Sequence, residues 1–143
     1  MRFMVTIPNS NNPEHMARCM QHVMHGVAEL NCYLLKQQPL PALAESGVQY
    51  QPEPFNRNLQ FDELPDCITI ADRGFADCAP LCCWRLAELW NAGERDANII
   101  IYWRNVQEKQ GHAVRTMHAQ VRRADGTRED PSRLYGMVGK TSD

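Results

Sequence analysis

The chain has 143 residues, of which 43% are hydrophobic and 22% are charged, and these values predict one ordinary soluble domain with a single core. Fifteen Lys and Arg residues against 17 Asp and Glu residues leave a formal net charge of −2, which argues against a nucleic-acid-binding protein that depends on a strongly basic surface. No run of about 18 apolar residues occurs, so neither a transmembrane helix nor a membrane partner is predicted.

The N-terminal residues predict a short strand and then a long helix. Residues 2–7 are rich in β-forming residues, and Pro13 suits the first turn of a helix capped by Asn11 or Asn12. The apolar residues that follow recur at steps of three and four and predict one buried stripe: Met16, Met20, Val23, Val27, Leu30 and Leu34. Residues 39–66 show no sustained period and predict an irregular wrap over the core.

The second half of the chain predicts a core helix and three antiparallel strands. Pro80 can occupy the first turn of the helix, and Gly93 fits a left-handed C-terminal cap. The buried face of this helix is predicted to consist of Cys82, Cys83, Leu86, Leu89 and Trp90. Residues 98–104 predict a strand, residues 105–113 a loop and residues 116–123 a second strand, with a third strand after a glycine turn.

The loop between the second and third strands decides on which face Asp130 lies. A two-residue loop would turn Asp130 away from the face that carries His118. A three-residue loop over residues 124–126, with Gly126 left-handed, places Asp130 opposite Gln120 and diagonal to His118, within reach of a carboxylate–imidazole hydrogen bond. We predict the three-residue loop.

The opening apolar stretch, residues 1–8, is too short for the core of a signal peptide and lacks a small-residue cleavage site. We therefore expect the reducing cytoplasm of a bacterial host. In that compartment the six cysteines are expected to be free thiols: Cys19, Cys32, Cys67, Cys78, Cys82 and Cys83.

Three residues have the chemistry of a nucleophilic site. Cys78 lies at the predicted start of the core helix, where unpaired N–H groups and the positive end of the dipole favour a thiolate, the form that a cysteine nucleophile requires. Its alternative role is that of a small core residue. His118 is either a base or a hydrogen-bonded strand histidine, and His112 in the preceding loop competes with it. Asp130 is either an orienting carboxylate or a turn aspartate before Pro131.

A metal or cofactor site is not predicted. Cys78, Cys82 and Cys83 lack the paired spacing of a structural zinc site, and His22 with His25 is only an i,i+3 pair on an amphipathic helix. The sequence contains no phosphate-binding glycine loop and no dinucleotide fingerprint.

Several segments in chain order resemble the transglutaminase-like superfamily. Residues 73–78, RGFADC, resemble the Gly-Asp-Cys that opens the core helix of this superfamily, and residues 117–121, MHAQV, resemble its histidine strand. Residues 125–132, DGTREDPS, resemble its aspartate strand. The likeness is greatest to small transglutaminase-like cysteine peptidases encoded in phage and prophage genomes, and it spans about residues 40–137. Further segments that look similar are residues 45–50, 102–104 and 130–137.

The predicted elements give an α+β plan, and the resemblance implies a transglutaminase-like, papain-like fold. In it, a core helix that carries the cysteine packs on a small antiparallel sheet, and an extra N-terminal helix lies alongside. Residues 1–143 then form a single domain, with an N-terminal extension of about residues 1–40.

The resemblance also implies a mechanism and a site. Cys78 is the nucleophile, His118 is its base and later its acid, and Asp130 orients the imidazole, while backbone N–H groups near Cys78 hold the oxyanion. The activity expected is that of a peptidase or amidase, or of an acyl transferase, on a peptide or protein substrate and without a cofactor. Water as the second substrate gives hydrolysis and an amine gives transfer; the sequence leaves both open.

The chain departs from the family pattern beside the cysteine. The family often has Gly directly before the Asp-Cys pair and acidic residues after it, whereas Ala76 precedes the pair here and Ala79-Pro80 follow it. Added bulk at Ala76 narrows a site in which backbone must approach closely. A second hypothesis therefore stays open: a catalytically inactive, virion-associated relative that joins phage structural proteins in the particle or during its assembly.

Overall fold

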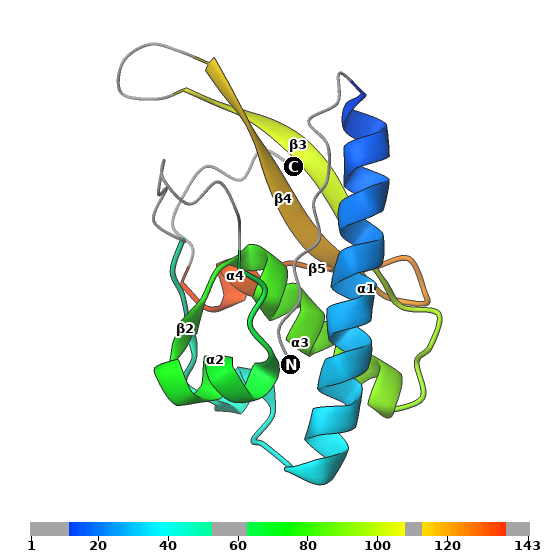
Figure 1. Ribbon diagram of the computed structural model, residues 1–143, viewed down its shortest axis with the longest axis vertical. Coiled ribbons are helices and arrows are strands. Elements are labelled where there is room, and N and C mark those ends of the chain that lie inside the picture. The colour runs from blue at the N-terminus through cyan, green and yellow to red at the C-terminus, as the bar shows by residue number, and fades with distance from the viewer. Residues whose placement is uncertain (1–11, 53–62, 108–112, 137–143) are drawn as a thin grey trace.

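The computed structural model describes residues 12–52, 63–107 and 113–136, which form a mixed α/β fold with small sheets (Figure 1). The helices in these ranges are α1 (Pro13–Gln37), α2 (Cys67–Arg73), α3 (Cys78–Asn91) and α4 (Pro131–Leu134), with a short 3-10 helix at Leu43–Glu45. An antiparallel sheet has the order β3 (Asn98–Gln107), β4 (Ala113–Arg122), β5 (Arg128–Glu129). A second, parallel pair joins β1 (Gln49–Tyr50) to β2 (Phe75–Ala76). The strand predicted over residues 2–7 lies outside the described residues.

The long helix α1 begins as predicted, but its most buried face is rotated from the predicted stripe, of which Met20, Val27 and Leu34 still pack against the core. The Asn12 side chain caps the helix by accepting a hydrogen bond from the His15 N–H, and proline follows in the first turn. The buried residues are Met24, Ala28, Asn31 and Cys32. Leu30, which we expected in the stripe, is 47% exposed. Small residues such as Ala28 face α3 because they allow the two helices to approach closely, which apolar periodicity does not reveal.

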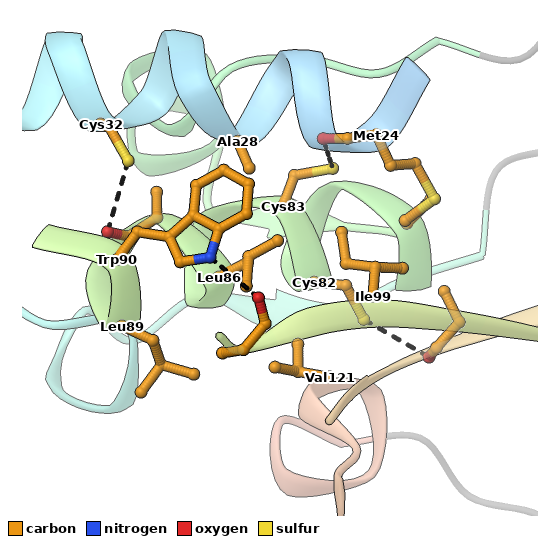
Figure 2. Packing of buried hydrophobic residues seen from close by; sticks show 14 residues of the cluster. Met24, Ala28, Cys32, Cys82, Cys83, Leu86, Leu89, Trp90, Ile99 and Val121 are labelled. Carbon is orange, nitrogen blue, oxygen red and sulfur yellow. Dashed lines mark hydrogen bonds between the residues drawn. The ribbon is translucent and has the colours of Figure 1, made fainter. Parts of the chain in front are cut away.

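Helix α3 forms the centre of the molecule. Its predicted buried face is confirmed, and Gly93 after it has the left-handed φ of 100° that was expected. Figure 2 shows α3 between α1 and the sheet, with side chains from all three packed together. Two buried thiols of α3 donate to backbone oxygens on either side: Cys82 Sγ to Ala119 O and Cys83 Sγ to Met24 O, both at 3.4 Å. All six cysteines are free.

The sheet has the predicted register in its second turn but not the predicted length in its first hairpin. Val121 pairs with Glu129, and Gly126 has φ 90°, so the loop over residues 124–126 has three residues as predicted. The loop predicted at residues 105–113 is wrong at both ends, because β3 continues to Gln107 and β4 starts at Ala113. The backbone hydrogen bonds between two paired strands form even where the side chains are polar and do not alternate with apolar residues. The polar composition of these residues therefore did not reveal that the strands continue.

Local elements that the sequence reading omitted surround the start of α3. Helix α2 is capped by Asp66 and ends at a left-handed Gly74, and both are ordinary boundary signals. Strand β2 then pairs with β1, and the Tyr50 N–H donates to Tyr135 O beyond α4 at 2.7 Å. These contacts hold the start of α3, β1 and the segment after α4 together. Among the helices described, none has the length and apolarity that crossing a bilayer requires.

Candidate active site

Cys78 is the first residue of α3 and faces β4. Its side chain is only 8% exposed. The backbone amide of Ala119, the residue after His118, lies near enough to the thiol to lower its pKa. The packing of α3 on β4 thus brings Cys78 near Ala119, 41 residues away in sequence, but among the described residues no hydrogen bond joins Cys78 to His118.

The expectation of a Cys78 thiolate is wrong for the resting molecule. Burial and, to a smaller extent, the carboxylates of Asp77 and Asp130 raise the pKa of the Cys78 thiol to about 12, although the amides of Ala119 and Ala79 oppose them. A helix N-terminus favours the thiolate only when that end remains positive and reachable by water. Here the cap itself is a carboxylate, and the thiol is almost closed off from solvent.

The Cys78 N–H is not free to bind an oxyanion in this state. It donates to Asp77 Oδ1 at 2.7 Å, because Asp77 is the N-cap of α3. Of the backbone N–H groups near Cys78 that were expected to hold the oxyanion, the N–H of Cys78 itself is therefore occupied.

His118 and Asp130 form the pair that the strand register predicted. His118 Nε2 and Asp130 Oδ2 are 2.8 Å apart, and their side chains are 2% and 11% exposed. Asp130 lies directly between β5 and α4, and the three-residue loop turns it toward the face of β4 that carries His118. The Tyr102 ring packs edge-on against the imidazole, with ring centres 5.4 Å apart.

The Asp130 carboxylate is ionised in spite of its burial. Burial alone raises the pKa of Asp130, but hydrogen bonds from His118 and Gln120 outweigh it and leave the pKa below its usual value. An ionised Asp130 can only accept a hydrogen bond, so His118 donates to it from Nε2. Nδ1 is then the ring nitrogen that can receive a proton.

Two of the carboxylate's neighbours were not predicted as site residues. Gln120 Nε2 donates to Asp130 Oδ2 at 3.2 Å, and Arg133 Nε lies 3.4 Å from the same oxygen. The signal for Gln120 was present in the sequence, because alternate residues of a strand share a face with His118. Arg133 required the helix α4, which was not predicted. The competing histidine, His112, lies outside the described residues.

No group of three or more His, Cys, Asp or Glu side chains within the described ranges is arranged to hold a metal ion. A cavity of about 220 Å³ lies near Asp130, and its lining includes Glu129 and Pro131 but not Cys78 or His118. Comparisons of the chain with protein-family models, with curated proteins and with solved structures found no match. Its function is therefore inferred from its own residues.

Proposed function

We propose that the protein is a cysteine-dependent acyl-transfer enzyme of the transglutaminase-like type, a peptidase or amidase or an acyl transferase. The observation that carries the proposal is the buried hydrogen bond between His118 and Asp130. Cys78 begins the helix that packs on the same strand, through the bond of Cys82 Sγ to Ala119 O. A nucleophile, a base and a group that orients the base are the parts that such chemistry requires. The resemblance of residues 40–137 to small phage and prophage peptidases supports the same assignment, and with it a bacterial cytoplasmic or virion-associated location.

The raised pKa of Cys78 favours a neutral thiol rather than a thiolate at rest. His118 Nδ1 then takes the thiol proton as the sulfur attacks the amide carbonyl, and Asp130 stabilises the imidazolium that forms. The imidazolium gives its proton to the departing amine when the C–N bond breaks. Water or a second amine, deprotonated by His118, then attacks the thioester and releases the thiol.

The fold proposed is transglutaminase-like. It is supported by the chain order of the parts: a helix that begins with cysteine, then a strand with histidine, then an aspartate at the end of the next strand. The long helix α1 is the N-terminal addition to that core, and it packs against α3 and also against strand β3 (Figure 2).

A second candidate is the inactive relative that acts as a structural or interaction protein. The observation that favours it is the near-complete burial of the Cys78 side chain, 8% exposed, with a pKa of about 12. In that case the bond between His118 and Asp130 serves only to fix α4 to the sheet.

Turnover of p-nitrophenyl acetate, a small activated ester, separates the two candidates. We expect turnover in the wild type and in the control Cys19→Ser, loss in Cys78→Ala, and a rate lower by about 10²–10⁴-fold in His118→Gln. An acetyl group should appear on Cys78 by mass spectrometry. A Cys78→Ala variant with unchanged circular dichroism and the wild-type rate would exclude the enzyme. Labelled casein with a fluorescent amine then separates hydrolysis from transfer.

A further inference from the structure

Gln120 belongs to the same buried polar group as His118 and Asp130. It lies two residues after His118 on β4, and its side chain therefore leaves the sheet on the same face. Gln120 is only 5% exposed. Its Nε2 donates to Asp130 Oδ2, the oxygen that also bonds to His118 Nε2.

The Asp130 carboxylate is held in one orientation by donors from two elements. His118 and Gln120 approach Oδ2 from β4, and Arg133 approaches it from α4. Asp130 Oδ1 is buried and has no hydrogen-bond partner among the described residues. Rotation of the carboxylate about Cβ–Cγ breaks all three of these contacts, and Gln120 places a second donor from β4 beside that of His118.

Core packing alone does not explain an amide at position 120. Gln120 Oε1 is also buried without a partner among the described residues, and leaving a buried acceptor unpaired is unfavourable. An apolar side chain of similar volume fills the same space without that cost. Among the described residues, the polar contact that this side chain makes is its donation to Asp130.

We propose that Gln120 is a positioning residue, which holds Asp130 so that Oδ2 accepts from His118 Nε2 and thereby keeps Nδ1 free of a proton. Its effect on catalysis rests on the function proposed above. Its effect on the imidazole does not, because the tautomer of His118 is a property of the folded chain. The lowering of the Asp130 pKa by Gln120 agrees with this role, since an ionised carboxylate is the better acceptor.

The test compares Gln120→Leu, which removes the amide, with the control Gln21→Leu. Gln21 donates to Ile99 O on β3 at 2.6 Å, so the control removes a side-chain bond to the same sheet without touching Asp130. The first readout is the ¹⁵N spectrum of the His118 ring, which reports the protonated nitrogen. We expect one tautomer, protonated at Nε2, in the wild type and in Gln21→Leu, and a mixture of tautomers in Gln120→Leu.

The second readout is ester turnover. In Gln120→Leu we expect kcat to fall by about tenfold or more with little change in KM, and the acid limb of the pH profile to move to higher pH, because Asp130 loses a donor. A single Nε2 tautomer in Gln120→Leu overturns the proposal. If Gln120→Leu does not fold, Gln120→Met replaces it, since this variant keeps the length of the side chain and removes the N–H donor without adding a charge. If Gln120→Leu changes the His118 tautomer but the wild type shows no ester turnover, the positioning role is supported and the proposed enzymatic function is rejected.

Discussion

The carboxylate of Asp77 binds the backbone N–H of Cys78 at 2.7 Å, so the residue that caps the core helix also occupies the amide beside the proposed nucleophile. The same carboxylate raises the pKa of the Cys78 thiol, although burial contributes more. One side chain thus stabilises the helix start and restrains the sulfur that the helix presents.

Replacing Asp77 by Asn separates these two effects. Asn keeps an oxygen that can cap the helix but removes the charge, so the pKa of Cys78 should fall from about 12 while burial still holds it above 9. Each unit of that decrease gives about tenfold more thiolate at a given pH. Iodoacetamide labelling against pH, followed for each cysteine by mass spectrometry, measures the change. Half-buried Cys19 serves as the internal reference, and Asp96→Asn, at an exposed position, is the control variant. An unchanged labelling profile of Cys78 in Asp77→Asn would contradict the effect of the Asp77 charge on the thiol.

Arg85 should contribute more to stability than an exposed arginine on the neighbouring strand. Its guanidinium binds both oxygens of Glu129 at 2.7 and 3.1 Å and also Glu88 at 3.2 Å, which ties α3 to β5. Arg85→Gln should cost about 1–2 kcal/mol of unfolding free energy. Exposed Arg128, beside Glu129, is the matched control, and Arg128→Gln should cost less than about 0.5 kcal/mol. Urea denaturation measures both, and equal costs would show that the network adds nothing.

His25 should make the packing of α1 on β3 depend on pH. Its Nε2 accepts the Ile99 N–H at 3.1 Å, and protonation removes that acceptor. Burial, with a smaller effect of His22, lowers the pKa of His25 below its ordinary 6.5. The folded state therefore binds fewer protons, and this stabilisation is complete above about pH 6.5 and is lost as the pH falls through the folded pKa.

Urea denaturation at about pH 7.5 and about pH 5.5 tests the His25 bond. The wild type should lose more stability between these values than His25→Gln, by about 0.5 kcal/mol, because solvent screens a partly exposed ring. The control is His22→Gln, an exposed histidine three residues before His25 on the same helix. Because His22 contributes only the smaller part of the lowering of the His25 pKa, His22→Gln should keep most of the pH dependence of the wild type. A loss of pH dependence in His22→Gln but not in His25→Gln would assign the effect to the wrong ring.

The two glycines Gly126 and Gly26 should respond oppositely to alanine. Gly126 has φ 90° in the loop that sets the register of Asp130, so Gly126→Ala should destabilise the fold by about 1 kcal/mol. Gly26 lies within α1, and a Cβ added there meets nothing within 4 Å, so Gly26→Ala should stabilise it by about 0.5–1 kcal/mol. Thermal unfolding of both variants measures the direction of each change in stability. A destabilising Gly26→Ala would contradict the open space found around a Cβ at this position.

Much of the fold near the site could be predicted because it depends on neighbours in sequence. The cap at Asn12 and the left-handed Gly93 follow from residue types at helix ends. The bond between His118 and Asp130 followed from the length of one loop, since a change of one residue moves every later side chain to the other face of the strand.

The features that could not be predicted depend on distant partners. The rotated face of α1 reflects how α3 packs against it, and the parallel contact of β1 with β2 joins segments 26 residues apart by only two residue pairs. The helix α4 begins at Pro131, a residue that in the sequence alone indicates only the end of a strand.

By itself, the sequence determined which residues carry the proposed chemistry and which strand face presents them, because side-chain type, strand alternation and loop length are local properties. Only the tertiary structure decided the state of that chemistry. The Cys78 thiol is protonated because it is buried, and the Cys78 amide is occupied because the Asp77 carboxylate accepts its hydrogen bond. Both depend on the three-dimensional arrangement of the side chains, which the spacing of residues in the sequence does not specify.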